Sequence, residues 1–252
     1  MDYRGKAVLI TGGASGIGAA AARLFAAAGA SVAIADRNGE AASALAQELP
    51  GAIACTVDVM NPDDCLAMVD AVRKAFGRLD CAFNNAGITE VAPLKGAPLP
   101  ETHELPLDIW RQVLGVDLDG VFHCLRAELP LLLESGGGAI VNTTSLQAHI
   151  SYPRTAAYTA AKHGVLGLTK TIAKEYGGRA IRCNAVSPGV VDTPLTNQVI
   201  HQPEYKDMLL APIPIGRFAQ PEDVAKAVVW LCSEDAAYIN GAVLAADGGY
   251  LA

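Results

Sequence analysis

The 252-residue chain has little positive charge and few long hydrophobic runs. Its 19 Lys and Arg residues stand against 26 Asp and Glu residues, which gives a net charge of −7. Nucleic acid is therefore not an expected partner, because binding to phosphates needs a basic surface. A membrane helix needs roughly 18 consecutive apolar residues, whereas the Ala-rich stretch 19–28 is interrupted by Arg23. The apolar run ending at Ile10 is too short for the core of a signal peptide, so we expect no membrane segment.

Metal-binding patterns are also missing. The six cysteines include no Cys-x-x-Cys pair, and the five histidines have no spacing typical of metal ligands. We therefore predict no metal site. Cysteines such as Cys81 and Cys183 lie within apolar runs, where cysteine behaves as a small hydrophobe. Reduced and buried cysteines are typical of the cell interior, which predicts a cytoplasmic protein.

The pattern along the chain is an alternation of short apolar runs and longer helical periods. Hydrophobic residues make up 51% of the chain, enough for a substantial core. Because the expected strands are continuously apolar, both faces of the sheet should be covered, as in parallel α/β sheets. The expected strands are 6–10, 31–35, 52–57, 80–83, 138–142, 180–186 and 242–246, and the expected helices are 17–28, 39–49, 62–76, 105–133, 156–176 and 221–233.

No change in composition suggests a second domain, so residues 1–252 are expected to form one α/β domain. The exception to the alternating pattern is a proline-rich stretch, 187–220, which reads as one long irregular connection. Long loops in compact domains are usually functional or mobile. We interpret 189–220 as a candidate substrate lid.

A glycine-rich turn, Thr11 to Gly18, connects the first expected strand to the first expected helix. Such a turn lets backbone amides and the helix dipole approach a pyrophosphate. The spacing is Gly-x-x-x-Gly-x-Gly and differs from the general dinucleotide fingerprint Gly-x-Gly-x-x-Gly. An ordinary tight turn remains the alternative for this segment alone.

Asp36 closes the second expected strand, 18 residues after Gly18. An acidic residue about 20 residues after the glycine turn bonds a ribose hydroxyl in dinucleotide-binding folds. Arg37 follows and could instead accept a 2′-phosphate, but the Asp36 carboxylate would repel it. This pair predicts NAD in preference to NADP, with a loop or capping role for Asp36 as the alternative.

Tyr158 and Lys162 are four residues apart on an expected helix and therefore share one face. A neighbouring ammonium and an oxidised nicotinamide both favour the phenolate, so we expect the pKa of this tyrosine to be lowered. A surface pair is the alternative, but the helix is largely apolar, and an unpaired buried lysine would be costly.

Several motifs occur together in a fixed order. They are the glycine turn, Asn84-Asn85-Ala86-Gly87, Ser145 placed 13 residues before Tyr158, the Tyr158–Lys162 pair and Pro188-Gly189. In this order they resemble the short-chain dehydrogenase/reductase family over nearly the whole chain. The resemblance implies a Rossmann-type, doubly wound fold with a seven-stranded parallel sheet and helices on both faces.

The resemblance also implies roles for individual residues. Ser145 would hold the substrate oxygen, Tyr158 would exchange its proton, and Lys162 would bind the nicotinamide ribose and lower the tyrosine pKa. Gln147, just past Ser145, could border the substrate pocket, with a solvated loop position as the alternative. The cofactor-binding residues would be Gly12, Ser15, Gly16, Ile17, Gly18, Asp36, Arg37, Asp58, Val59, Asn85, Ala86, Gly87, Tyr158, Lys162, Pro188, Gly189, Val191 and Thr193.

One position departs from the family pattern. Asp117 lies where the family usually has a catalytic Asn that helps to hold a water in a proton relay to the lysine. An ionised carboxylate accepts hydrogen bonds but cannot donate them. Asp117 is therefore included with Ser145, Tyr158 and Lys162 in the expected catalytic group, although the details of the relay are open.

The sequence thus predicts an NAD(H)-dependent oxidoreductase that interconverts a secondary alcohol and a ketone by hydride transfer. One alternative is a 3-oxoacyl-thioester reductase, against which Asp36 argues because those relatives tend to use NADPH. Another is a nucleotide-sensing protein that has lost turnover. The family resemblance and the apolar character of helix 156–176 suggest a homotetramer, and apolar residues around 195–209 suggest a hydrophobic small-molecule substrate.

Overall fold

The computed structural model describes residues 1–94 and 97–252 and contains one seven-stranded sheet. All strand pairs are parallel, as predicted, and the order β3-β2-β1-β4-β5-β6-β7 reverses direction between β1 and β4. In sheets of this kind ligands bind at the carboxyl ends of the strands beside such a reversal. The strands are β1 (Ala7–Thr11), β2 (Ser31–Asp36), β3 (Ile53–Thr56), β4 (Cys81–Asn84), β5 (Gly138–Thr143), β6 (Ile181–Pro188) and β7 (Val243–Ala246).

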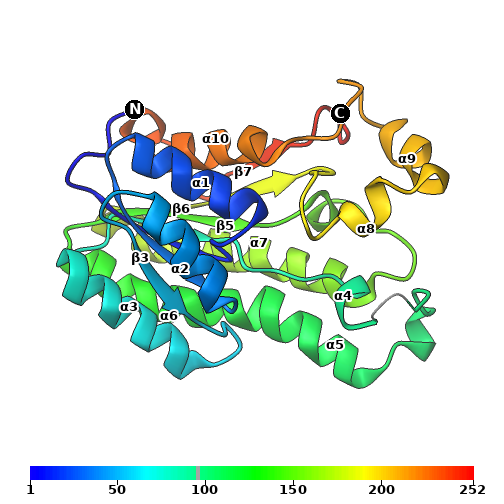
Figure 1. Cartoon of the computed structure of the whole chain (residues 1–252), viewed down its shortest axis with the longest axis horizontal. Helices are drawn as coiled ribbons and strands as arrows, with labels where there is room; N and C mark the ends of the chain where they lie inside the picture. Colours follow the sequence, from blue (N-terminus) through cyan, green and yellow to red (C-terminus); the bar gives the residue numbers. More distant parts are fainter. Residues whose placement is uncertain (95–96) are drawn as a thin grey trace.

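Helices cover both faces of this sheet (Figure 1). Successive residues of β1 point to opposite faces: Val8 and Ile10 join one hydrophobic cluster, and Leu9 joins the other. The first cluster contains residues of α1 (Gly16–Ala27), α2 (Gly39–Glu48) and α10 (Pro221–Cys232). The second contains residues of α3 (Pro62–Phe76), α6 (Gly120–Glu134) and α7 (Ala156–Tyr176). The doubly wound fold expected from the sequence is confirmed.

Capping residues explain where several helices begin. Asn61 caps α3 by accepting a hydrogen bond from the backbone of Asp63 at 3.0 Å, and Pro62 occupies the first turn. Gln220 and Asp223 form a reciprocal capping box at α10, which also starts with a proline. These capping patterns are local in sequence, and the helix starts predicted from them, at residues 62 and 221, are confirmed.

The predicted helix 105–133 is a helical run with a change of pitch in its middle. Residues Leu107–Leu114 form α5, Gly115–Asp119 form the π-helical turn η2, and α6 follows directly. Both glycines at the ends of this turn lie in tight contacts: a Cβ on Gly120 would approach Val59 Cγ2 to 2.7 Å, and one on Gly115 would approach Met60 Cε to 2.7 Å. Hydrophobic periodicity does not reveal such a π turn, because the turn depends on packing against Val59 and Met60 in the loop before α3.

The expectation that 187–220 is irregular throughout is wrong. Strand β6 extends through Pro188, and the segment contains α8 (Asn197–Ile200) and α9 (Pro203–Leu210). Pro203 takes the first helical position of α9, where its missing N–H costs nothing. The two ends of the segment are joined, because Ala219 N donates to Val190 O at 3.0 Å and Asp192 N donates to Ala219 O at 2.8 Å.

The remaining elements are short. A further helix that the sequence did not predict, α4 (Val91–Leu94), follows β4 closely. All six cysteines are buried, as expected. No helix among the described residues is long and apolar enough to cross a membrane, and no three metal-ligating side chains gather there. The short 3-10 helices are η1 (Thr102–Glu104), η3 (Leu146–Ala148), η4 (Gly177–Arg179) and η5 (Glu234–Ala236).

Candidate active site

A cavity of about 270 Å³ lies at the carboxyl ends of β1, β2 and β4, beside the reversal of strand order. The glycine turn, the end of β2 and the segment after β4 all border it. The sequence-predicted residues that line it are Gly12, Ser15, Gly16, Ile17, Asp36, Arg37, Asp58, Val59, Asn85, Ala86, Gly87 and Thr193.

The glycine turn is locked to the segment after β4. Gly12 has φ +59°, and a Cβ there would come within 2.8 Å of Ala86 Cα, so only glycine fits. The Asn85 side chain donates to the carbonyl oxygens of Thr11 at 3.2 Å and Gly12 at 3.1 Å. The hydroxyl of Thr11 in turn accepts from the backbone of Asn85 at 3.1 Å. This bonding fixes two walls of the cavity relative to each other.

The N-terminus of α1 faces this cavity, and within residues 1–94 and 97–252 no group accepts from the N–H groups of its first three residues. Ser15 is the N-cap residue, but its side chain makes no capping bond, and the first turn carries no acidic residue. Gly16 has φ +50° and also lines the cavity. Gly18 lines neither cavity of the site and serves packing, because a Cβ there would lie 2.1 Å from Gly12 O. Free amides and an uncompensated dipole fit the pyrophosphate of a dinucleotide.

Asp36 lies at the end of β2 and holds the glycine turn. Its Oδ2 accepts from Ala14 N at 3.0 Å and its Oδ1 from Asn38 N at 2.9 Å. Because each carboxylate oxygen has two lone pairs, the side chain can still accept bonds from ribose hydroxyls. Asp36 and Arg37 both line the cavity.

A second cavity of about 110 Å³ adjoins the first and contains the predicted catalytic group. Five residues line both: Ile17, Asn85, Gly87, Thr193 and Leu195. The second cavity is also lined by Asp117, Ser145, Tyr158, Lys162, Pro188, Gly189 and Val191. The structure therefore brings together residues that are up to 179 positions apart along the chain, from Ile17 to Thr196.

Lys162 is the electrostatic centre of this cavity. Its Nζ lies 2.9 Å from Asp117 Oδ2, donates to Thr143 O at 3.2 Å and lies 5.3 Å from the centroid of the Tyr158 ring. Burial lowers the pKa of Lys162, but the charges of Asp117 and Tyr158 outweigh it and raise the pKa above its ordinary value. The ammonium form is therefore favoured.

The pKa of Tyr158 is raised above its ordinary value by the groups of the protein itself. Burial raises the pKa of the phenol and is the largest effect. Lys162 and a hydrogen bond with Ser145 lower it, whereas the charges of Asp117 and Glu90 raise it. The predicted effect of the lysine is present, but the cost of burying the phenolate exceeds it. Asp117 itself has a raised pKa, because burial outweighs its bonds to Lys162 and to the backbone of Ile88.

The backbone N–H of Gln147 donates to Ser145 Oγ at 3.2 Å, but its side chain makes contacts outside the catalytic group. It borders neither cavity, and its Oε1 accepts from the hydroxyls of Thr155 at 2.8 Å and Thr159 at 2.9 Å. Its contacts hold the N-terminal turn of α7 against η3.

Three backbone or side-chain contacts of the site were not found from the sequence. They are Thr143 O on Lys162, Ile88 N on Asp117 and the Glu90 carboxylate on Tyr158 N. The first two are backbone groups of ordinary residues and give no sequence signal. The only sign of a special role for Glu90 is its burial, and burial cannot be read from the sequence because the tertiary structure creates it.

Known proteins match this chain over nearly its whole length. Residues 12–251 match the family model described as enoyl-(acyl carrier protein) reductase. The D-threitol dehydrogenase of Mycolicibacterium smegmatis is 44% identical to this chain, over 99% of the chain and 95% of that protein. The chain belongs to the short-chain dehydrogenase/reductase family.

Other members of this family are similarly close. The 2,5-dichloro-2,5-cyclohexadiene-1,4-diol dehydrogenase of Sphingobium indicum is 41% identical over 100% of this chain and 99% of that protein. The 3-ketoacyl-(acyl-carrier-protein) reductase of Brucella melitensis, solved in complex with NADH, superposes with a TM-score of 0.90. It is 33% identical, with 99% of both chains covered. Our protein is thus an oxidoreductase that interconverts alcohol and carbonyl groups with a nicotinamide cofactor.

Proposed function

We propose that this short-chain dehydrogenase/reductase interconverts a secondary alcohol and a ketone with NAD(H), using Tyr158 as the group that exchanges the substrate proton. The observation that carries the proposal is the cavity shared by Ser145, Tyr158 and Lys162, which adjoins the cavity beside the glycine turn. Reactant, acid–base group and cofactor can therefore meet in one place.

The residues act through position and charge. Ser145 and Tyr158 hold the reacting oxygen with their hydroxyls, and Tyr158 takes the proton from the alcohol or returns it to the ketone. Lys162 keeps its charge through Asp117 and favours the phenolate. Bound NAD⁺ would supply the hydride acceptor, and its positive charge before transfer would also favour the phenolate of Tyr158. Ile17, Asn85, Gly87, Pro188, Gly189, Val191 and Thr193 would bind the nicotinamide half.

Asp36 supports NAD in preference to NADP. Its carboxylate lines the cavity and is held in place by two backbone donors, so it would meet a 2′-phosphate with a like charge. We expect kcat/KM to favour NAD⁺ by at least about tenfold, which corresponds to about 1.4 kcal/mol. In Asp36→Ala this preference should fall, with Arg37 left to bind the phosphate. A preference of the wild-type protein for NADP⁺ would contradict the proposal.

Tyr158 has apolar neighbours from α5 and α7. Tyr158 packs with a small cluster that includes Ile109, Val113 and Trp110. A panel of secondary alcohols should therefore be oxidised with NAD⁺, with cyclic and aliphatic alcohols preferred to highly charged ones. The names of the relatives above support a panel of polyols and cyclic diols. Absence of turnover with every member would count against the proposal.

A second candidate is reduction of a 3-oxoacyl thioester. It is favoured by the similarity to the Brucella melitensis reductase, whose complex with NADH shows that such a reductase can bind the cofactor we propose. Asp36 therefore does not separate the two functions. NADH oxidation with acetoacetyl-coenzyme A, compared with a simple cyclic ketone, distinguishes them directly.

A further inference from the structure

Glu90 is a buried carboxyl group that the mechanism above does not use. It lies between β4 and α4 and is 1% exposed. Its Oε1 accepts a hydrogen bond from the backbone N–H of Tyr158 at 2.9 Å. Among the described residues no group donates to Oε2, which is also buried. Burial of an acidic side chain costs free energy, so we expect an interaction at this position that offsets the cost.

The reason lies at the N-terminus of α7, which has no cap of its own. Thr155 is the N-cap residue, but its side chain makes no capping bond, and the first turn contains no acidic residue. The first N–H groups of a helix have no partner within it, and the helix dipole favours a negative charge there. Tyr158 is the third residue of α7, whose N–H a capping side chain usually binds. Glu90 supplies this cap from a distant part of the chain.

The segment that carries Glu90 also borders the cofactor cavity. Asn85 and Gly87 line both cavities of the site. Ile88 N donates to Asp117 Oδ1 at 2.8 Å, and Asp117 is paired with Lys162 on α7. The segment 85–90 is therefore attached to α7 twice, once through Asp117 and once through Glu90.

We propose that Glu90 is a positioning residue, whose carboxylate caps α7 and fixes the backbone of Tyr158 relative to the cofactor-binding segment 85–90. The inference rests on the proposed role of Tyr158. Tyr158→Phe tests the role of Tyr158 without changing Glu90. If Tyr158→Phe is inactive, substitutions of Glu90 then test whether Glu90 positions Tyr158. Persistent activity of Tyr158→Phe would instead overturn the proposed function.

The charge of Glu90 also acts on the phenol. The charged groups that face Tyr158 are Glu90, Asp117 on η2 and Lys162 on α7 itself. Burial raises the pKa of Glu90, while backbone donors of Tyr158 and Ala157 lower it. Because a carboxylate opposes ionisation of the phenol, its removal should lower the pKa of Tyr158.

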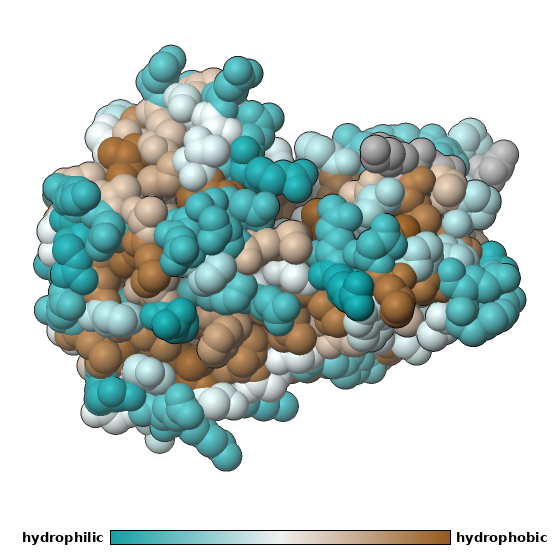
Figure 2. All heavy atoms as spheres, turned by 90° about the horizontal axis from the view of Figure 1, so that it is seen from below, coloured by the Kyte–Doolittle hydropathy of each residue, from teal (hydrophilic) through white to brown (hydrophobic). Residues whose placement is uncertain are grey.

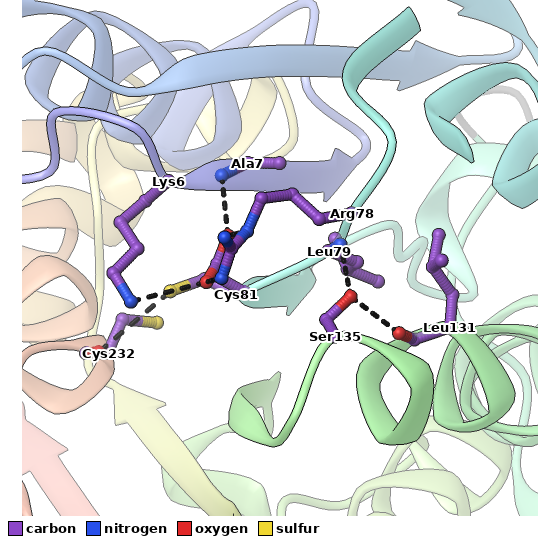
Figure 3. Close-up of polar contacts among 9 residues, drawn as sticks. Lys6, Ala7, Arg78, Leu79, Cys81, Leu131, Ser135 and Cys232 are labelled. Carbon is purple, nitrogen blue, oxygen red and sulfur yellow. Dashed lines mark hydrogen bonds and ion pairs between the residues drawn. The ribbon is translucent and has the colours of Figure 1, made fainter. Parts of the chain in front are cut away.

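The experiment compares Glu90→Gln, Glu90→Ala and Ser135→Ala in the full-length protein. Glutamine keeps an acceptor oxygen for Tyr158 N and removes the charge, whereas alanine removes both. Ser135→Ala is the matched control, since Ser135 Oγ accepts from Leu79 N, also at 2.9 Å, at the opposite end of the sheet (Figure 3). Turnover, binding of NADH followed by its fluorescence, and ionisation of Tyr158 followed by ultraviolet difference spectra against Tyr158→Phe are measured for each.

The expected results differ among the variants. Glu90→Ala should lose at least about tenfold in kcat while its Kd for NADH changes less than about twofold, and Glu90→Gln should recover most of this loss. In both, ionisation of Tyr158 should move to lower pH, whereas Ser135→Ala should lose only thermal stability. Wild-type kcat in Glu90→Ala, or an equal loss in Glu90→Gln and Glu90→Ala, would overturn the proposal. If Glu90→Ala does not fold, an unmoved Tyr158 ionisation in Glu90→Gln overturns it equally.

Discussion

Tyr158 carries the chemistry of this protein, and the charges around it decide when it can act. Lys162 favours the phenolate, whereas burial, Asp117 and Glu90 oppose it, and the balance raises its pKa. A raised pKa suits donation of a proton to a ketone at neutral pH. Alcohol oxidation needs the phenolate, so the positive charge of the oxidised cofactor must act together with that of Lys162 to lower the pKa of Tyr158.

Replacement of Tyr158 by phenylalanine removes only the hydroxyl group. General acid–base catalysis typically contributes about 10²–10⁴-fold, so turnover should fall by at least this range, while the fold and NADH binding are kept. Tyr176→Phe, in the last turn of the same helix, is the matched control and should keep its turnover. Activity of Tyr158→Phe close to wild type would refute the proposed role.

Asp117→Asn tests the electrostatic part of this account. The Asp117 carboxylate raises the pKa of Tyr158. Its removal should lower that pKa, and because oxidation needs the phenolate, the rise of kcat/KM with pH should move to lower pH. The pH profile for alcohol oxidation is the measurement. A profile that stays in place, or moves to higher pH, would show that Asp117 does not act on the tyrosine in this way.

At the residue scale, residues that the reaction requires can be predicted from the sequence, whereas residues that matter through tertiary packing cannot. The glycine turn, Ser145, Tyr158 and Lys162 were predicted because their residue types and spacing are constrained by the reaction, and the structure brings them together. Glu90 could not be predicted. A glutamate in a loop is usually solvated, and its burial depends on contacts between segments 68 residues apart.

The same distinction holds for secondary-structure elements. Strand positions and most helix starts follow from local patterns, such as Asn61-Pro62 before α3. The π turn at Gly115–Asp119 does not, because it adds no signal to the hydrophobic period. Such turns occur frequently at functional sites, and this one places Asp117 against Lys162.

The segment 189–220 is the element for which we predict motion. Both of its ends are held by the Val190–Ala219 contacts, while Met208 and Ile215 within it are strongly exposed. We propose that it closes over substrate and excludes water from the site of hydride transfer. Trypsin should cut at Lys206 more slowly when NADH and a substrate analogue are bound, and its cutting at Lys74 on α3 should not change. Equal cutting at Lys206 in both states would contradict closure.

At the scale of the whole molecule, the parallel sheet and its covered faces follow from alternating elements and the handedness of their connections. The quaternary structure does not follow from these patterns, because it depends on which residues lie on the outer surface of the helices. The helices below the sheet in Figure 1 expose hydrophobic residues, which form patches between polar ones in Figure 2. Phe122 is 51% and Leu133 36% exposed on α6, and Leu107 is 66% exposed on α5.

We propose that these residues lie in a subunit interface of a homotetramer. Light scattering of the wild-type protein should give the mass of a tetramer, and Phe122→Glu should give a smaller species, because a buried unpaired charge is strongly unfavourable at an interface. Tyr238→Glu, at a fully exposed aromatic residue after η5, is the control and should leave the mass unchanged. A monomeric wild-type protein would contradict the proposal.

The Val190–Ala219 contacts also have a consequence for how this protein could diversify. Because main-chain bonds already join the two ends of the intervening chain, its length is largely decoupled from the sheet. Each doubling of a loop costs only about 0.6 kcal/mol in closure entropy. Residues after Thr193 in this segment can therefore be exchanged, lengthened or shortened together, which makes new substrate preferences accessible without changing the catalytic group or the cofactor-binding residues Val191 and Thr193.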